Sequence, residues 1–415
     1  MTDAGEALSR VVGEDWGRLI ALLVSRYRRV DLAEDALADA VEAAARTWPE
    51  QGVPDNPAAW LNTTAQRRLL DRLRSEGTWQ RTVERLTTDS PTTAPGADTM
   101  ANLPDVDDDL LRLVMMCAHP ALALEAAAAL SLRLVLGVST ADIARLFLVS
   151  EPTMAARITR AKKKIVTAGI GFDVPASDDL PGRLETVAQV GYLAFTAGYA
   201  PGSGPDVVRT ELSGEAIRLV ETVLGLRPGE PVLVALLALM LLQHSRRDAR
   251  VDADGQLVLL ADQDRTRWHH DEIVRARHLI DDLDTTDELP ALAASNLVQA
   301  LIAWEHASAP TAADTAWPRI VRHYDTLLRI APSPAAALAR AVAVAEADGP
   351  LAGLKALEGI ELVGHRLESV RAELLTRAER WDEAELAFVR AIEACDNDAE
   401  RSHLERRLTE MRARA

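Results

Sequence analysis

The chain has 415 residues, of which 48% are hydrophobic, 26% are charged and only 4% are aromatic. This length favours two to four domains, and a sequence rich in Ala and Leu favours helices over strands, so we expect an all-α protein. The longest uninterrupted apolar run, residues 231–242, is too short to cross a bilayer, and we therefore expect a cytoplasmic protein without membrane contact.

The net charge of −17 is distributed unevenly. Residues 1–170 carry a net charge of −3, whereas residues 171–415 carry −14, and basic runs occur at 67–74 and 145–164. Nucleic-acid binding by the front part is therefore compatible with the acidic total. Only two cysteines are present, Cys117 and Cys395, so a disulfide framework and a CxxC metal clip are excluded, and we expect two buried thiols.

The first informative segment is a predicted helix over residues 31–46 with an acidic stripe. Asp31, Asp35, Asp39 and Glu42 follow helical spacing, with Leu and Ala on the opposite face. Because carboxylates repel phosphates, this stripe is expected to face either solvent or a basic protein partner.

The next helix, predicted within residues 55–74, combines an aromatic residue with basic ones. Its expected buried residues are Leu61, Ala65, Leu69, Leu70 and Leu73. On the opposite stripe, Arg67 and Arg74 could hold phosphates, and Trp60 could stack against an unstacked base. The alternative is that Trp60 packs on the preceding helix and that the arginines form a solvated face.

Two linkers are predicted, at 86–104, which is rich in Thr, Pro and Gly, and at 171–182. They divide the chain into parts comprising residues 1–85, 105–170 and 183–415.

Residues 139–165 predict a helix-turn-helix. Ser139 or Thr140 caps a first helix that buries Ile143, Ala144 and Phe147; residues 148–150 turn the chain, and Pro152 opens the second helix. In the second helix, one stripe is apolar, and a separate stripe could enter a major groove. The apolar stripe consists of Met154, Ile158, Ala161 and Ile165, and the polar stripe of Thr153, Arg157, Arg160 and Lys164. The alternative is an ordinary amphipathic helix with a solvated basic face.

The remaining residues predict helices of 10–16 residues, with one short hairpin at 250–260. A 32-residue repeat aligns Ile320, Tyr324 and Leu327 with positions 352, 356 and 359, and then with Ala384, Phe388 and position 391. This spacing is similar to that of the second helix of a tetratricopeptide repeat, which favours a helical solenoid over an ordinary bundle.

These segments together resemble the extracytoplasmic-function group of the bacterial sigma-70 family. Asp-Leu-Ala-Glu-Asp-Ala (31–36), Pro-Ala-Ala-Trp-Leu-Asn-Thr-Thr-Ala (57–65) and Asp-Arg-Leu-Arg (71–74) resemble sigma region 2. Residues 142–154 and Arg-Ile-Thr-Arg-Ala-Lys (157–162) resemble region 4. Residues 193–199, 263–268 and 317–320 are similar to the C-terminal extension, with tetratricopeptide-like repeats, of one subgroup.

The resemblance implies a promoter-specific RNA polymerase subunit whose partners are core polymerase and promoter DNA. The acidic helix would dock on the β′ clamp helices through Asp31, Asp35, Asp39 and Glu42, region 4 would meet the β flap, and residues 86–104 would thread toward the RNA exit path. The loop 51–56 and the following helix would open the −10 element through Asn56, Trp60, Asn62, Arg67, Arg68 and Arg74. The −35 element would be contacted by Thr153, Arg157, Arg160, Lys163 and Lys164.

Enzyme and cofactor functions are disfavoured, because the phosphate-loop, dinucleotide-binding, HExxH and GxSxG motifs are absent. His269, His270, Asp271 and His278 suggest a metal, but His270 and His278 lie about 12 Å apart along one helix, so no metal is expected. The alternative functions are a helix-turn-helix regulator with a solenoid sensor domain and a pure scaffold. The acidic extension could either mask the basic stripes or, as we favour, hold the two sigma regions in a working arrangement and take a protein partner.

Overall fold

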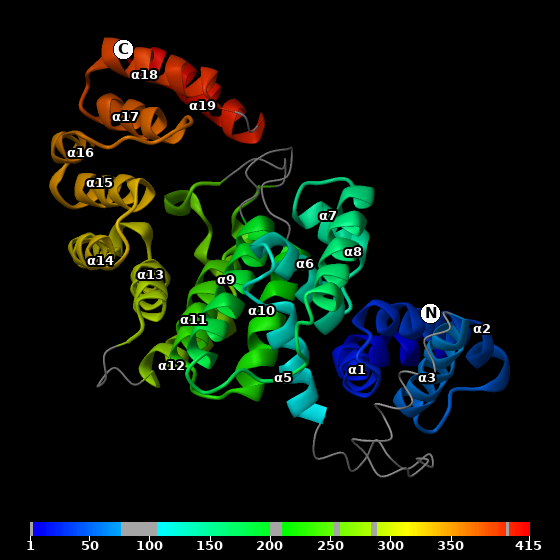
Figure 1. Cartoon of the computed structure of the whole chain (residues 1–415). Helices are drawn as coiled ribbons and strands as arrows, with labels where there is room; N and C mark the ends of the chain where they lie inside the picture. The colour runs from blue at the N-terminus through cyan, green and yellow to red at the C-terminus, as the bar shows by residue number, and fades with distance from the viewer. Residues whose placement is uncertain (1–2, 76–105, 200–209, 253–257, 284–288, 396–397) are drawn as a thin grey trace. The chain divides into compact units, whose positions relative to one another are not determined.

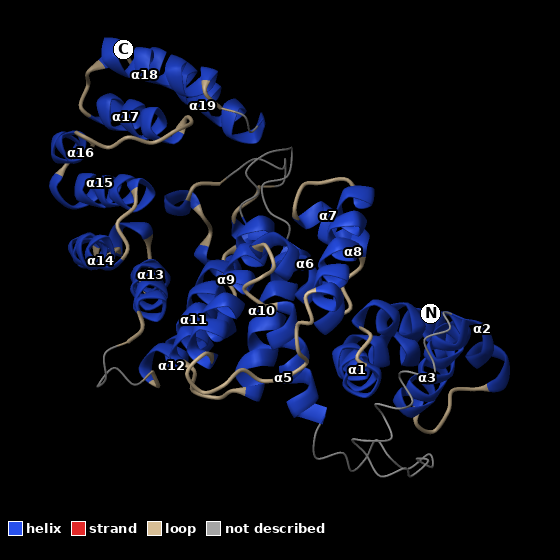
Figure 2. Ribbon diagram, in the orientation of Figure 1, coloured by secondary structure: helices blue, strands red, loops and turns tan. Residues whose placement is uncertain are grey.

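The computed structural model describes residues 3–75, 106–199, 210–252, 258–283, 289–395 and 398–415. These residues form helices and no strand, which confirms the all-α prediction (Figures 1 and 2). They divide into two compact units, of which the first comprises residues 1–194 and 218–228 and the second 195–217 and 229–415. Within the described ranges, no helix combines the length and apolarity needed to span a membrane.

The first unit is built from helices of 7 to 25 residues around a core rich in Leu and Ala. Its helices are α1 (Asp3–Tyr27), α2 (Val30–Gln51), α3 (Pro57–Ser75), α5 (Val106–Cys117), α6 (Leu124–Val135), α7 (Thr140–Leu146) and α8 (Glu151–Thr167). Two further helices, α9 (Leu180–Tyr199) and α10 (Thr210–Leu226), contribute residues to both units.

The first three helices pack on one another, and their buried faces follow the predicted spacing. On α3, Leu61, Ala65, Leu69 and Leu73 are fully buried as predicted, whereas Leu70 is half-buried. The side chain of Asn56 caps α3 by accepting a hydrogen bond from the Ala59 amide at 3.0 Å. The predicted linker at 86–104 lies outside the described residues.

The helix-turn-helix is confirmed, and two serines define it. Ser139 caps α7 by accepting from the Asp142 amide, and Ser150 caps α8 by accepting from the Thr153 amide. Between them, Leu148 takes the left-handed conformation with φ 55°, which reverses the chain. The buried face of α7 differs from the prediction at one place, because Leu146 is buried and Phe147 only half-buried.

Helix α1 approaches α6 and the turn after it unusually closely. A Cβ atom on Gly17 would lie 2.2 Å from the Val135 carbonyl oxygen, so only glycine fits at this crossing. At Gly137, φ is +72°, and a Cβ atom would lie 2.8 Å from the ring of Trp16. The Trp16 indole in turn donates to the Arg133 carbonyl at 3.1 Å. The first three helices therefore pack directly against the helix-turn-helix part.

The predicted break at 171–182 is ordered and partly packed. Phe172 is buried, and the Arg28 guanidinium lies 5.6 Å from its ring centre while donating to its carbonyl oxygen. This segment therefore adheres to the first unit.

The second unit is a succession of paired helices, and consecutive helices from α13 to α19 contact each other (Figure 1). Its helices are α11 (Pro231–His244), α12 (His270–Asp281), α13 (Ala291–Ala307), α14 (Trp317–Ile330), α15 (Pro334–Asp348), α16 (Pro350–Ala356), α17 (Arg366–Arg377), α18 (Trp381–Glu393) and α19 (Asp398–Arg412). Single 3₁₀ turns are η1 (Arg247–Ala249), η2 (Leu260–Asp262), η3 (Arg265–Arg267) and η4 (Ala312–Asp314).

The predicted repeat falls on α14, α16 and α18, with a shifted register in α16. In α18, Ala384, Phe388 and Ala391 are fully buried. In α16 the buried position is Gly353, not Ala352, because a Cβ atom there would lie 2.4 Å from that of Ala345 on α15. The succession of helices is that of a solenoid, whereas membership in the tetratricopeptide repeats stays a prediction.

At the predicted hairpin, residues 250–260, one backbone hydrogen bond joins the two sides: the Val258 amide donates to the Arg250 carbonyl at 2.9 Å. Its turn, at 253–257, lies outside the described residues.

Candidate nucleic-acid interface

Helix α8 separates an apolar stripe from a basic one. Met154, Ile158, Ala161 and Ile165 are buried with at most 4% exposure, so they fix the rotation of the helix. That rotation leaves the polar stripe outside: Thr153, Arg160, Lys163 and Lys164 are exposed, and Arg157 is half-exposed.

The basic side chains on this outer face differ in whether they already bind another group of the protein. Lys164 donates to the Ala121 carbonyl before α6. In the described part of the chain, Arg157, Arg160 and Lys163 make no ion pair or hydrogen bond. Three positive groups on one helix face are therefore free to bind phosphates or base edges.

Helix α3 presents a second basic surface. Arg67 and Arg68 are exposed and have no ion-pair partner among the residues described, whereas Arg74 pairs with Asp71 at 3.2 Å. Asn62 accepts a hydrogen bond from the Gln66 side chain at 3.3 Å. Only part of the predicted set is thus unoccupied in the free protein.

Trp60 does contact the preceding helix, as the alternative interpretation expected. Its ring meets that of Trp48 on α2 edge to face, with centroids 5.6 Å apart and an angle of 71° between the planes. Trp60 nevertheless stays half-exposed. The contact holds the ring in one orientation at the start of α3 without burying it.

The four acids of the α2 stripe are exposed or half-exposed, as expected, and each also has a basic side chain of the same chain nearby. Asp39 accepts from Arg72 of α3 at 2.8 Å, and Asp35 lies 3.8 Å from the same guanidinium. The remaining two acids pair locally: Asp31 binds Arg29 through both carboxylate oxygens, and Glu42 lies 3.8 Å from Arg46. Burial raises the pKa of Asp31, but the bonds from Arg29 outweigh it and leave that pKa below its usual value.

A buried charge cluster joins α2 to the helix-turn-helix, and sequence reasoning missed it. Glu34 of α2 is 6% exposed and forms ion pairs with Arg133 of α6 at 2.5 Å and with Lys162 of α8. Burial raises the pKa of Glu34, but the ammonium and the guanidinium more than compensate and hold it below the usual value. The signal was present, since both Glu34 and Lys162 fall at helical positions on an apolar face.

Of the three histidines considered for a metal, one pairs with other side chains and two are exposed. His269 pairs with Asp248 at 2.7 Å and accepts from Arg247, while His270 and His278 are exposed. Both cysteines are buried and free of disulfides.

The chain was compared with protein families, with curated proteins and with solved structures. Family models described as Sigma-70 region 2, Sigma-70 region 4 and a family of unknown function, DUF6596, match residues 14–78, 112–165 and 183–283. An uncharacterized protein of Rhizobium meliloti (strain 1021), R00370, is 38% identical over 410 residues, which are 94% of this chain and 92% of that protein. No solved structure matches the chain significantly.

The matched stretches coincide with the surfaces described above. The region 2 match contains α2 and α3, with the acidic stripe and the Trp60 helix, and the region 4 match contains α6, α7 and the basic stripe of α8. A helix-turn-helix regulator without polymerase partnership does not account for the region 2 match. The chain therefore belongs to the sigma-70 family and is an RNA polymerase sigma factor with regions 2 and 4 of the extracytoplasmic-function type followed by a long C-terminal extension.

Proposed function

We propose that α8 reads the −35 element of the promoter and that residues 51–56 with α3 recognise and open the −10 element. The observation that carries this proposal is the exposed face of α8, where Arg157, Arg160 and Lys163 have no protein partner in the described chain. Thr153 and Lys164 flank them on the same face. A major groove admits one helix, and arginine is the commonest partner of guanine there.

At the −10 element, Arg67 and Arg68 hold the phosphate backbone, and Trp60 captures or wedges against an unstacked base. Its edge-to-face contact with Trp48 supports this role, because a ring already held in place loses little entropy on stacking. Stacking of one base on an aromatic ring contributes about 1–3 kcal/mol, comparable with the cost of unstacking it. Asn56, Asn62 and Arg74 complete the contact set.

Docking on the polymerase follows the charge pattern. The α2 stripe of Asp31, Asp35, Asp39 and Glu42 binds the basic β′ clamp helices, and region 4 binds the β flap. In this assignment residues 1–85 form region 2 and residues 105–170 form region 4. Residues 86–104 connect the two along the RNA exit path. After a linker at 171–182, residues 183–415 form the extension.

The arrangement of the first unit is the closed form of the free protein. The −10 and −35 elements are about 25 base pairs apart, which is about 85 Å of B-DNA at about 3.4 Å per pair. Helices α3 and α8 both pack on α2, and packed helix axes lie about 8–10 Å apart, so the two DNA-contacting helices are within roughly 20 Å of each other. Both elements cannot be bound in this arrangement, and the Glu34 cluster must therefore open when the holoenzyme engages a promoter.

The acidic extension supports transcription and does not mask the DNA-binding faces. Residues 171–415 carry a net charge of −14, and solenoid surfaces of this kind serve protein contacts. The extension then holds regions 2 and 4 at their working distance and takes a protein partner, in the cytoplasm where promoter and polymerase meet.

Footprinting with purified core polymerase tests the assignment. Core enzyme with this protein should protect both a −35 and a −10 element, and an Arg157→Ala, Arg160→Ala double variant should lose protection at −35 first. A complex that binds core but protects no promoter of this two-element type contradicts the proposal.

A further inference from the structure

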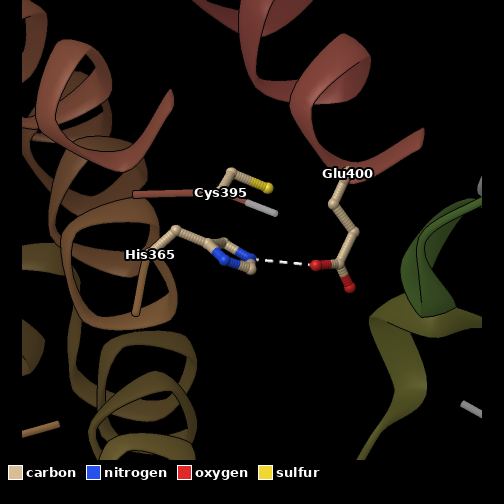
Figure 3. A group of neighbouring side chains, drawn as sticks. All are labelled: His365, Cys395 and Glu400. Atoms are coloured by element: carbon tan, nitrogen blue, oxygen red, sulfur yellow. Dashed lines mark ion pairs between the residues drawn. The ribbon is translucent and has the colours of Figure 1, made fainter. Parts of the chain in front are cut away.

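Three side chains that can ligate a metal meet at the end of the second unit, far along the chain from the sigma regions. His365 precedes α17, Cys395 follows α18, and Glu400 lies in the first turn of α19. Figure 3 shows the imidazole and the carboxylate pointing toward each other beside the thiol. Their ligand atoms all lie within 4.8 Å of one another, and the imidazole Nε2 is 2.9 Å from a Glu400 carboxylate oxygen.

These distances are close to those around a bound ion. For zinc, bond lengths of about 2.0–2.3 Å and tetrahedral angles place neighbouring ligand atoms roughly 3.3–3.6 Å apart. The His365 and Glu400 atoms, at 2.9 Å, are slightly closer than this, and no pair of ligand atoms is more than 4.8 Å apart. Shifts of about an ångström, within reach of side-chain rotation, bring all three into a common coordination sphere.

The chemical types of the ligands select the metal. A thiolate, an imidazole and a carboxylate are the three groups that zinc binds in proteins, whereas calcium and magnesium take oxygen ligands only. Cys395 is 2% exposed, but the side chains of His365 and Glu400 are 16% and 35% exposed, so the site is open to solvent on one side. An entering ion therefore keeps a water molecule in its fourth position.

The backbone around the thiol is fixed independently of any ion. Arg401 donates two hydrogen bonds to the Cys395 carbonyl, at 3.2 and 2.5 Å. Cys395 also packs in a core cluster with Phe388 of α18 and with Leu404 and Leu408 of α19. The thiol is thus held at the junction of two helices, which reduces the entropy cost of binding an ion there.

We propose that His365, Cys395 and Glu400 bind one Zn²⁺ ion that ties the start of α17 and the end of α18 to α19. On binding, the Cys395 S–H bond breaks, the sulfur forms a bond to zinc, and the proton goes to solvent; the imidazole binds neutral and the carboxylate ionised. This site is separate from the DNA and polymerase contacts and does not depend on their assignment.

The test uses the full-length protein after treatment with a chelator. Calorimetric titration with Zn²⁺ should give one ion per chain, and the Cys395→Ser variant should bind at least about 100-fold more weakly, since even outer contacts of zinc ligands contribute 10–100-fold. Titration with Co²⁺ should produce thiolate-to-cobalt charge-transfer absorption that is lost in Cys395→Ser and kept in Cys117→Ala, which removes the other buried cysteine.

If Cys395→Ser fails to fold by circular dichroism, Glu400→Gln takes its place, with the same loss of zinc affinity expected. Zinc uptake that is absent, or that survives in both variants, overturns the site. A cobalt spectrum without the thiolate band also overturns it, because the ion would then be bound elsewhere on the acidic surface.

Discussion

Replacing Glu34 by Gln is expected to open the closed form of the first unit. Glutamine keeps the size of the side chain but removes the negative charge that pairs with Arg133 and Lys162. The two cations would then stay buried at the interface between α2 and the helix-turn-helix without the carboxylate that both of them contact, although Asp31 still attracts Lys162 from a greater distance. In the open form they are hydrated, so the substitution penalises the closed form selectively.

The size of the effect follows from the burial of the three groups. The side chain of Glu34 is 8% exposed, that of Lys162 is 11% and that of Arg133 is 18%. Breaking a buried pair by removing one partner costs about 3–5 kcal/mol. The ratio of open to closed molecules should therefore rise roughly 100- to 5,000-fold.

Fluorescence energy transfer in the free protein measures this ratio. Labels on cysteines introduced at Arg68 of α3 and Lys163 of α8, both exposed, report the separation of the two DNA-contacting helices. Glu34→Gln should convert a high-transfer population into a low-transfer one. Glu42→Gln is the matched control on the same helix, because Glu42 is exposed and, among the residues that the structure describes, pairs with Arg46 of its own helix alone.

A second substitution distinguishes loss of the Glu34 charge cluster from general damage to region 2. Lys162→Met in the Glu34→Gln background removes one orphaned charge and should restore part of the high-transfer population, since apolar replacement of a buried pair is often neutral or stabilising. Unchanged transfer in a folded Glu34→Gln protein refutes the reasoning. In the closed form the pKa of Glu34 lies below its ordinary value of 4.5. Ionised Glu34 therefore stabilises the closed form fully above about pH 4.5, and this stabilisation is lost as the pH falls through the lowered pKa.

Three further predictions concern the −35 contacts, polymerase docking and the stability of the extension. Arg157→Ala and Arg160→Ala should each weaken promoter binding by the holoenzyme by about 1–3 kcal/mol if they reach base edges; an equal loss on promoters with an altered −35 element would mean phosphate contacts instead. Asp39→Lys should abolish binding to core polymerase in a pull-down. Arg72→Ala should not, because it removes the same 2.8 Å ion pair without reversing the acidic charge. Equal binding by the two variants would contradict docking by the Asp39 carboxylate. Burial, with two nearby arginines, lowers the pKa of His306 to about 4, so unfolding takes up a proton at mildly acid pH and stability should fall by up to about 3 kcal/mol from pH 6.5 to pH 4. His306→Gln should flatten that pH dependence in urea unfolding, and an unchanged slope would assign the dependence to other groups.

The helix-turn-helix was predictable because its determinants are local. Ser139, Ser150 and Pro152 each act within one helical turn, so their effect is legible in the sequence. The contact between Glu34 and Lys162 is different, since 128 positions separate the two residues along the chain. Their positions on apolar faces indicate that each needs a partner, but only the packing of α2 on α8 shows that they are partners.

The repeat and the metal cluster show the same limit in the extension. A 32-residue spacing identifies α14, α16 and α18, but the close approach of α15 selects Gly353 over Ala352 as the buried position of α16. His365 precedes Cys395 by 30 residues, a spacing outside the short metal-binding motifs, and the two meet because α17 and α18 pack in antiparallel succession. Packing between helices, which no local pattern encodes, decides both which residue of α16 is buried and which side chains form the metal cluster.

The effect of the extension on transcription depends on where a truncation ends. A fragment ending at Asp179 would lose residues 180–194 and 218–228, which belong to the first compact unit. Arg183 donates to a carbonyl of α5 at 2.5 Å and Arg218 to a carbonyl of α1 at 3.0 Å, so that fragment would also lose contacts of the sigma regions themselves. A fragment ending after Pro228 keeps both contacts. Loss of transcription by this longer fragment, when it is folded and still binds core polymerase, would support a positive role of the remaining extension, whereas higher transcription would mean that the extension inhibits.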